Sequence, residues 1–348
     1  MDMEDKMTRL DNRYLWKIQR EKEKTVAVNV KGEKIELPET FGQYHHGDVI
    51  AVEDSGKVRR MHDGSSTSAL VYVTNQCNSN CIMCPDSVKQ RTRENIVEWN
   101  WLTEYISLLP SDLMHIDITG GEPTLLKDQL PELIERIRIQ ISEAEILMLS
   151  NGRSFAAKSY AEKFSIFSNR KLKIEIPVHS DIPELHDQIA GFRGSFEQTR
   201  IGIHNLLSAG VEVGIRIVIS RLNYQKLQDL IRYLKKEFPQ INYVNIMGME
   251  MLGNAWKNRE AVWVEFEDAK EYLQQAVKDS FSYGLEPSLY NFPLCLFDKK
   301  FWYCYRRSIS DYKIVYDTEC EKCKEKGQCG GFFASTFHYT KYKVRLQE

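Results

Sequence analysis

The sequence predicts an α/β fold built on parallel strands and crossover helices. From Ala69 onward, short apolar runs rich in Val, Ile, Leu and Met alternate with amphipathic segments of helical period, which is the pattern of a parallel sheet wound by helices. Six strand-type runs are present, whereas a closed TIM-type barrel has eight strands. We therefore expect a partial (β/α)6 TIM-type barrel with functional groups on the loops at the carboxyl ends of its strands.

Each element of this barrel follows from the spacing of its apolar residues. Apolar runs and apolar-polar alternation indicate strands, and the expected strands are 70–74, 114–119, 146–150, 172–178, 211–220 and 243–249. Apolar residues three and four positions apart indicate helices, and the expected helices are 99–109, 128–141, 155–167, 196–209, 225–237 and 266–281.

Two further parts flank the barrel, which we place at residues 67–284. Residues 1–66 are expected to form a small β-rich cap or recognition unit with a charged, helical start and strands at 25–30, 34–37 and 48–52. Turn signals at Lys31-Gly32-Glu33 and Asp54-Ser55-Gly56 separate these strands, and 63–68 reads as a linker. Residues 285–348 are irregular, aromatic and rich in cysteine, so we expect a bound metal or cluster to organise them.

Composition narrows the class of protein. The chain has 348 residues, of which 42% are hydrophobic and 28% charged, as in ordinary globular proteins. A formal net charge of -2 gives no overall attraction to nucleic acid or to an anionic membrane. The first twenty residues lack the apolar centre of a signal peptide, and no stretch is apolar enough to span a bilayer. We therefore expect a cytoplasmic protein without a membrane partner.

The eight cysteines gather in two groups, Cys77 to Cys84 and Cys295 to Cys329. The cytosol keeps thiols reduced, so grouped cysteines indicate metal ligation or catalysis rather than disulfides. Cys77, Cys81 and Cys84 follow the first expected strand with spacings of four and three, and such a loop can wrap an iron-sulfur cubane. Zinc is the alternative, but a structural zinc site needs a fourth ligand, and no nearby Cys or His supplies one.

Three thiolates for four irons leave one iron open, and the amino and carboxylate groups of a methionine moiety could chelate it. At this point the sequence resembles the radical S-adenosylmethionine (SAM) superfamily. The stretch 115–123, His-Ile-Asp-Ile-Thr-Gly-Gly-Glu-Pro, looks like the second strand of that family and its GGEP loop. The resemblance implies that this loop lines the site for the SAM amino group, through Gly120, Gly121, Glu122 and Pro123.

The resemblance, which covers roughly residues 69–255, suggests further SAM-binding positions. In the family, polar residues after the third and fourth strands reach the SAM carboxylate or ribose, and positions on or near other strands border adenine; the matching residues are Met83, Ser150, Asn151, Ser180 and Met247. Arg216 could pair with the SAM carboxylate or form a buried ion pair, and Met83 and Met247 could equally be core residues. Ser195 is a natural N-cap for the helix that follows it.

The family resemblance also implies a reaction. A reduced [4Fe-4S] cluster gives one electron to SAM, which yields methionine and a 5′-deoxyadenosyl radical, and the radical abstracts a hydrogen atom from the substrate. An external one-electron reductant such as flavodoxin or ferredoxin is then required. No catalytic side chain beyond the cluster ligands can be identified from the sequence.

The second cysteine group resembles the auxiliary-cluster extensions called SPASM and twitch. It consists of Cys295, Cys304, Cys320, Cys323 and Cys329. A full SPASM domain has seven cysteines for two clusters, and Phe333 stands where a fourth closely spaced cysteine is expected. We therefore expect one auxiliary [4Fe-4S] cluster and one spare cysteine, which the sequence does not identify. A zinc site is the alternative.

Chains with such tails mostly modify ribosomally made peptides or activate partner enzymes. Cys77-Asn78-Ser79 and the stretch 329–333 resemble the peptide maturases of the His-Xaa-Ser system, so a peptide or protein is the expected substrate. The alternatives are modification of RNA, a nucleotide or a small metabolite, and a non-catalytic iron-sulfur scaffold or redox sensor. Nucleic acid is disfavoured, although cations and aromatic residues alternate locally at 299–307.

Overall fold

A computed structural model of the chain describes residues 15–21, 24–52, 57–92, 94, 97–168, 171–309 and 311–346. They form two compact units, which are described separately. The first unit comes from the chain up to Gln76 together with residues 93–149, and the second from residues 77–92 together with 150–348.

The first unit begins with a five-stranded antiparallel sheet of order β3-β2-β1-β4-β5. Its strands are β1 (Leu15–Glu21), β2 (Lys24–Val28), β3 (Lys34–Leu37), β4 (Val49–Val52) and β5 (Val58–His62). The three strands expected from the sequence are present as β2, β3 and β4. The expected helical start is wrong over β1, because Trp16 and Ile18 alternate with polar residues and are buried in the core of the sheet. Residues 1–14 and the expected turn at 54–56 lie outside the described residues.

The same unit contains three parallel strands of the barrel and their helices. The strands are β6 (Ser68–Tyr72), β7 (His115–Thr119) and β8 (Glu145–Leu149), and the helices are α3 (Trp99–Leu108) and α4 (Gln129–Gln140). The antiparallel sheet is tied to α3, because Glu104 accepts from the backbone N–H of Leu15 at 2.7 Å and Tyr105 donates to the Met61 carbonyl at 3.1 Å.

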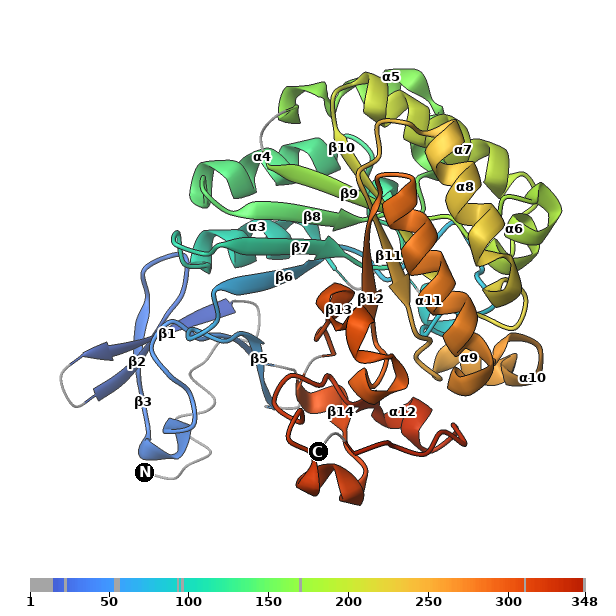
Figure 1. The fold of residues 1–348 in the computed structure, drawn as a ribbon. Coiled ribbons are helices and arrows are strands. Elements are labelled where there is room, and N and C mark those ends of the chain that lie inside the picture. The colour runs from blue at the N-terminus through green and yellow to red at the C-terminus, as the bar shows by residue number, and fades with distance from the viewer. Residues whose placement is uncertain are drawn as a thin grey trace. The chain divides into compact units, whose positions relative to one another are not determined.

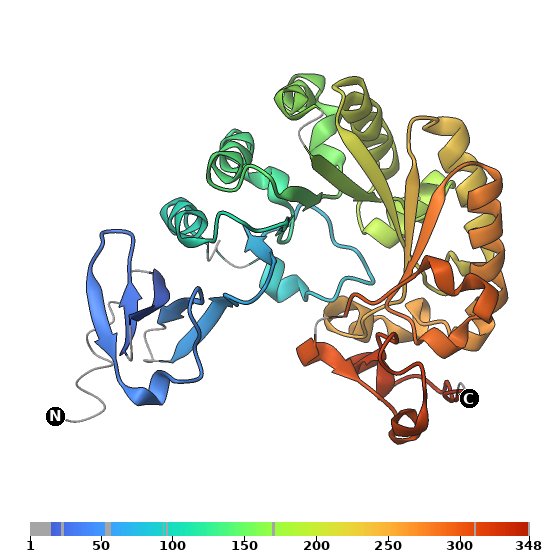
Figure 2. The same cartoon turned by 60° about the vertical axis from the view of Figure 1, so that its left-hand side comes forward.

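The second unit continues the β/α alternation (Figure 1). Its parallel strands are β9 (Leu172–Pro177), β10 (Glu212–Val218), β11 (Tyr243–Met247), β12 (Glu286–Tyr290) and β13 (Tyr305–Arg306). Its helices are α2 (Val88–Arg91), α5 (Lys158–Glu162), α6 (Pro183–Ala190), α7 (Ser195–Ser208), α8 (Leu227–Glu237), α9 (Gly253–Lys257), α10 (Arg259–Val262), α11 (Phe266–Ser282) and α12 (Ala334–Phe337). Helices α7, α8 and α11 lie along the outer side of β9 to β12 (Figure 2).

The expected fold class is confirmed, since the described residues carry eight parallel strands in chain order with helices between them. Six of these strands are the expected ones. The other two, β12 and β13, lie where we expected irregular chain, and β13 has only two residues. The expected helix at 155–167 is shorter, because a 3-10 turn at Arg153–Ala156 precedes α5 and another follows it.

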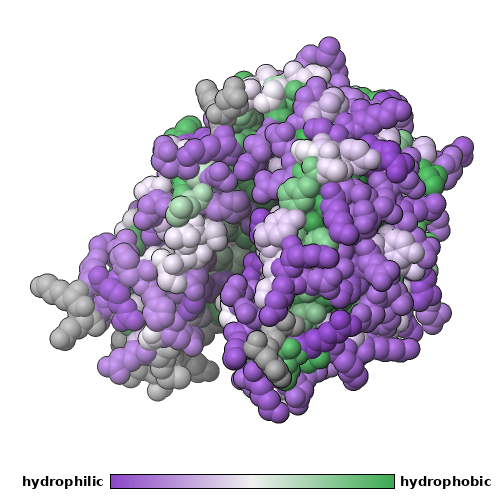
Figure 3. Space-filling view, in the orientation of Figure 1, coloured by the Kyte–Doolittle hydropathy of each residue, from purple (hydrophilic) through white to green (hydrophobic). Residues whose placement is uncertain are grey.

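The tail after β12 is as irregular as expected. It contains short 3-10 turns, among them η7 (Lys299–Cys304), and one two-stranded ladder of β14 (Ile314–Val315) with β15 (Phe332–Phe333). Figure 3 shows a face that is mostly hydrophilic, with apolar side chains in small separate patches. Within the part of the chain that the structure describes, no helix is both long and apolar enough to cross a bilayer.

Candidate iron-sulfur and SAM site

Cys77, Cys81 and Cys84 lie on one loop of the second unit, and each thiol is partly exposed. The Cys84 N–H donates to the Cys81 carbonyl at 3.2 Å, and the Ser79 N–H donates to the Cys77 sulfur at 3.4 Å. Burial, and to a smaller extent the neighbouring thiolates of Cys84 and Cys77, raise the pKa of Cys81 to about 12. The loop therefore brings three thiols close enough to repel one another as thiolates, a repulsion that bound metal relieves.

Helix α6 holds this loop by its backbone. The N–H groups of Asn80 and Ile82 donate to the carbonyls of Ala190 and Ile189 at 3.1 and 3.0 Å. Gly191, with a φ of +64°, ends the helix, and a Cβ atom there would stand 2.1 Å from the Asn80 carbonyl oxygen. A glycine is therefore required for the helix to end against the loop.

Helix α9 holds the other side of the loop. Asn254 donates through its side chain to the Cys81 carbonyl at 3.0 Å and through its backbone to the Cys84 carbonyl at 2.9 Å. Asn258 donates to the Ile82 carbonyl at 2.9 Å. These bonds occupy the carbonyls of Cys81, Ile82 and Cys84 and hold the loop against α9.

The GGEP turn belongs to the first unit and is described within it. The Gly121 N–H donates to the Thr74 carbonyl at 2.7 Å, and the Glu122 N–H donates to the Gln76 carbonyl at 2.8 Å. A Cβ atom on Gly121 would stand 2.1 Å from the Gln76 carbonyl oxygen, so the close approach needs glycine. Gln76 directly precedes Cys77 in the chain, so these bonds fix the backbone from which the cluster loop departs.

Glu122 and Pro123 are part of the same turn. Glu122 is buried, and its Oε1 accepts from the backbone N–H and the hydroxyl of Thr124 at 3.1 and 2.7 Å. Pro123 opens a 3-10 turn at Pro123–Leu126. The carboxyl group that the sequence assigns to the SAM amino group thus also caps its own turn.

Ser150, Asn151 and Ser180 follow strands β8 and β9. The hydroxyls of Ser150 and Ser180 accept from the N–H groups two residues further on, at 3.1 and 3.0 Å. Asn151 instead reaches the cluster loop, where it donates to Asn78 Oδ1 at 2.6 Å. The structure therefore brings Asn151 to the cysteine loop.

Arg216 of β10 lies beside Met247, the last residue of β11. Arg216 contacts the Met247 sulfur at 2.9 Å and forms an ion pair with the buried Glu175 at 3.5 Å. Asn245 also donates to Glu175, at 2.7 Å. The sequence reasoning missed Glu175 and Asn245, although a polar residue in the middle of each of two apolar strands could have marked them. Met83 is buried.

The helix start at 195 differs from expectation. Gly194, not Ser195, holds the N-cap position of α7, and Asp187 of α6 accepts from the Phe196 N–H at 2.8 Å, from the Ser195 hydroxyl at 3.1 Å and from the Gly194 N–H. Burial raises the pKa of Asp187, but these hydrogen bonds outweigh it and hold the pKa below its usual range.

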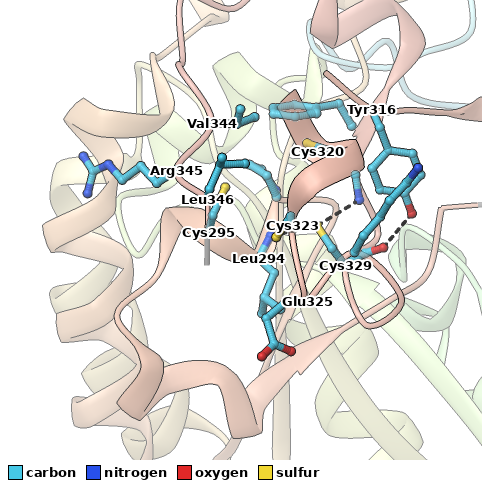
Figure 4. A pocket seen from close by; sticks show the side chains of 14 residues that line it. Leu294, Cys295, Tyr316, Cys320, Cys323, Glu325, Cys329, Val344, Arg345 and Leu346 are labelled. Carbon is cyan, nitrogen blue, oxygen red and sulfur yellow. Dashed lines mark hydrogen bonds between the residues drawn. The ribbon is translucent and has the colours of Figure 1, made fainter. Parts of the chain in front are cut away.

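Four of the five tail cysteines line one small cavity in the second unit, and Figure 4 shows their sulfurs around it. They are Cys295, Cys320, Cys323 and Cys329. The N–H groups of Leu294 and Gly331 both donate to the Cys329 sulfur at 3.3 Å, and Tyr342 donates to the Cys295 sulfur at 3.4 Å. Hydrogen bonds of this kind stabilise the thiolate form that iron requires.

Cys304 lies apart from this cavity. It is buried at the end of η7, and its thiol donates to the Phe301 carbonyl at 2.9 Å. Burial raises the pKa of Cys304 to about 11. The structure thus separates this cysteine from the other four in the tail.

Whether these residues fit a cluster depends on their type and arrangement. In the described residues, no three His, Cys, Asp or Glu side chains are close enough together to share a single metal ion. A cubane binds each of its cysteines through a different iron. The loop supplies three thiols and the tail cavity four, and thiolates are the ligands that iron-sulfur clusters take.

The fold and the loop define a class, an α/β partial barrel with a three-cysteine motif after its first strand. The Radical SAM superfamily matches residues 71–252, more than half of the chain. The chain therefore belongs to the Radical SAM superfamily of enzymes.

Two curated relatives are similar to about half of the chain. Fe-coproporphyrin III synthase of Methanosarcina barkeri is 27% identical over 181 residues, which cover 50% of this chain and 43% of that protein. Sporulation killing factor maturation protein SkfB of Bacillus subtilis is 25% identical over 164 residues, which cover 47% of this chain and 38% of that protein. The match thus spans less than half the length of either relative.

Two solved structures share the fold. Streptococcus suis SuiB bound to S-adenosylmethionine aligns with a TM-score of 0.50 at 12% identity and covers 65% of this chain and 51% of its own. The structure of anSMEcpe with bound AdoMet aligns with a TM-score of 0.52 at 16% identity and covers 64% of this chain and 61% of its own.

Proposed function

We propose that this chain is a radical SAM enzyme that abstracts hydrogen from a side chain or α-carbon of a ribosomally made peptide or protein. The observation that carries the proposal is the loop with Cys77, Cys81 and Cys84, whose backbone is fixed from both sides by α6 and α9. Three thiols leave one iron of a cubane without a protein ligand, and that vacancy is what SAM requires.

The residues of the chain have defined parts in this reaction. Cys77, Cys81 and Cys84 would hold the cluster, which when bound supplies the electron that cleaves SAM and generates the 5′-deoxyadenosyl radical. The electron comes from an external one-electron reductant such as flavodoxin or ferredoxin. Gly120 and Gly121 would line the site for the SAM amino group, in a turn that packs so closely on the Thr74 and Gln76 backbone that neither position has room for a Cβ atom.

Residues of the GGEP turn, of the cysteine loop and at or near the strand ends would orient SAM. These are Glu122 and Pro123 for the amino group, Ser150, Asn151, Ser180 and Arg216 for the carboxylate and ribose, and Met83 and Met247 for adenine. Arg216 forms an ion pair with Glu175 and contacts the Met247 sulfur, so a structural ion pair is the alternative role for this residue.

An auxiliary [4Fe-4S] cluster in the tail is the second part of the proposal. Cys295, Cys320, Cys323 and Cys329 would be its ligands, because they line one cavity, and Cys304 would be the spare cysteine. We also propose that residues 1–66 form a cap, residues 67–284 the barrel and residues 285–348 the cluster extension. A cluster at this position could anchor the substrate or accept an electron from it.

A peptide substrate is supported by the relatives. SkfB is a maturation protein for the sporulation killing factor, and one anSMEcpe structure, which aligns with a TM-score of 0.51, contains a bound peptide. The His-Xaa-Ser type of maturase is the finer form of this proposal. Fe-coproporphyrin III synthase and GTP 3',8-cyclase are each similar over about half of the chain, which supports a small molecule as the alternative substrate.

SAM cleavage tests the chemistry. Anaerobic protein that is reduced and supplied with SAM should release 5′-deoxyadenosine, the Cys81→Ala variant should release none, and the Cys304→Ser variant should match the wild type. Release of 5′-deoxyadenosine at the wild-type rate by Cys81→Ala would contradict the proposed ligand set.

Co-production with candidate peptides tests the substrate. Each short peptide encoded beside the gene would be co-produced with the wild-type chain or with Cys81→Ala, and its mass measured. A mass change that requires Cys81 supports a peptide substrate. If no peptide changes, and 5′-deoxyadenosine release instead rises on addition of a porphyrin or guanosine triphosphate, the small-molecule alternative holds.

A further inference from the structure

Two buried arginines hold the three residues between Cys77 and Cys81. Arg91 at the end of α2 donates to the Ser79 carbonyl at 2.8 Å and to Asn80 Oδ1 at 2.7 Å. Arg153 donates to the Asn78 carbonyl and to the Ser79 hydroxyl, and its guanidinium stacks on Phe192 with 3.5 Å to the ring centroid. The loop that would carry the cluster is thus held between two positive charges.

Arg91 is the more unusual of the two. The residue is only 5% exposed, and its Nε is buried without a hydrogen-bond partner among the residues that the structure describes. Its described hydrogen-bond acceptors, the Ser79 carbonyl and the Asn80 amide, are neutral. A buried cation that is bonded only to neutral groups is unfavourable unless negative charge lies nearby.

The cysteine loop itself carries negative charge when its thiols hold a cluster. The Ser79 carbonyl and the Asn80 side chain, to which Arg91 donates, belong to the two residues directly before Cys81 in the chain. The guanidinium is therefore held against the part of the loop that leads into Cys81, in a site of low polarity where electrostatic interactions are strong. A cluster bound by these thiols gains one negative charge when it is reduced, and a fixed cation nearby favours the reduced form.

We propose that Arg91 is a positioning residue that holds the cysteine loop and, by its buried positive charge, raises the reduction potential of the cluster bound there. This inference rests on the proposed function, since it requires a cluster on Cys77, Cys81 and Cys84. Arg153 differs from Arg91 in its contacts. It binds the Asn78 end of the same three residues, and its guanidinium is held by Gln198 and Phe192.

Redox titration of the anaerobic protein tests the proposal. The signal followed is the electron paramagnetic resonance of the reduced cluster that changes when SAM is added, so that a tail cluster is not counted. In Arg91→Gln the ratio of reduced to oxidised cluster at the wild-type midpoint should fall at least about tenfold, which is about 59 mV for a one-electron couple. Arg91→Lys should stay close to the wild type because the charge remains.

Two further variants separate charge from structure. Asn80→Ala removes one hydrogen-bond acceptor of Arg91 and keeps the charge, so the midpoint should not move. Arg232→Gln, which removes an exposed arginine paired with Asp229 on α8, should also leave it unchanged. If Arg91→Gln binds no cluster, Arg91→Lys and Asn80→Ala still test the proposal, because both keep the positive charge. A displaced midpoint potential in both variants would show that geometry rather than charge sets the potential.

The outcomes also separate the two proposals. A wild-type cluster whose midpoint is the same in Arg91→Gln overturns the role of Arg91 and leaves the proposed function intact. Wild-type protein without any SAM-sensitive cluster overturns the proposed function, and the role of Arg91 with it.

Discussion

Replacing Gly191 by alanine should disturb the packing of the end of α6 against the cysteine loop. A left-handed backbone costs an alanine about 1–2 kcal/mol, and Gly191 has a φ of +64°. The added methyl would also meet the Asn80 carbonyl at 2.1 Å, and overpacking of this kind costs about 1–3 kcal/mol. The Gly191→Ala variant should therefore lose about 2–5 kcal/mol of unfolding free energy.

Gly194 provides the matched control for this prediction. Its φ is +85°, but nothing lies within 4 Å of a Cβ atom there, so Gly194→Ala should lose only about 1–2 kcal/mol. Denaturant titration gives the unfolding free energy of both variants. Iron and sulfide analysis shows whether the cysteine loop still holds its cluster. Gly191→Ala should also lose cluster, whereas Gly194→Ala should keep it. Equal losses of stability with full cluster in both variants would refute the packing of Gly191 against the loop.

Three further predictions concern other parts of the chain. Asp187→Asn should lose about 1–2 kcal/mol of unfolding free energy at pH 7. Because folding lowers the pKa of Asp187, the whole difference should be present above the ordinary pKa of an aspartate and should vanish as the pH falls through the pKa of the folded state. Denaturation at several pH values measures it. Cys320→Ser should remove about four irons per chain and Cys304→Ser none, and equal iron contents would contradict the tail ligand set. Trp16→Ala should cost about 3–5 kcal/mol, and an unchanged thermal transition would show that the β1 core is not part of the cooperative fold.

Much of the fold could be predicted from the sequence because parallel strands and their helices are marked by local apolar spacing. Strands that the sequence did not predict lack this apolar spacing. β1 has charged residues at its exposed positions and reads as a polar segment, and β13 has only two residues, fewer than any periodic pattern needs. Such strands form because neighbouring strands offer them hydrogen bonds, which local sequence does not record.

The site divides in the same way. The grouping of the cysteines in the sequence predicts two candidate cluster sites, one on the loop and one in the tail. The groups that hold the loop come from distant segments, as with Asn254, which is 174 residues from its partner Asn80. The capping of α7 by Asp187 rather than Ser195 is similar, because the acceptor comes from the preceding helix. The separation of Cys304 from the other four tail cysteines becomes visible only in the folded tail, where those four line one cavity.

The most direct test of the central claim is the electron paramagnetic resonance of the reduced loop cluster with and without SAM. Measured in a Cys320→Ser background, so that only the loop contributes, the spectrum should change when SAM binds the open iron, and Cys81→Ala should abolish the signal. A signal that ignores SAM, or one that persists without the Cys81 thiol, would contradict a three-cysteine cluster with a vacant metal position.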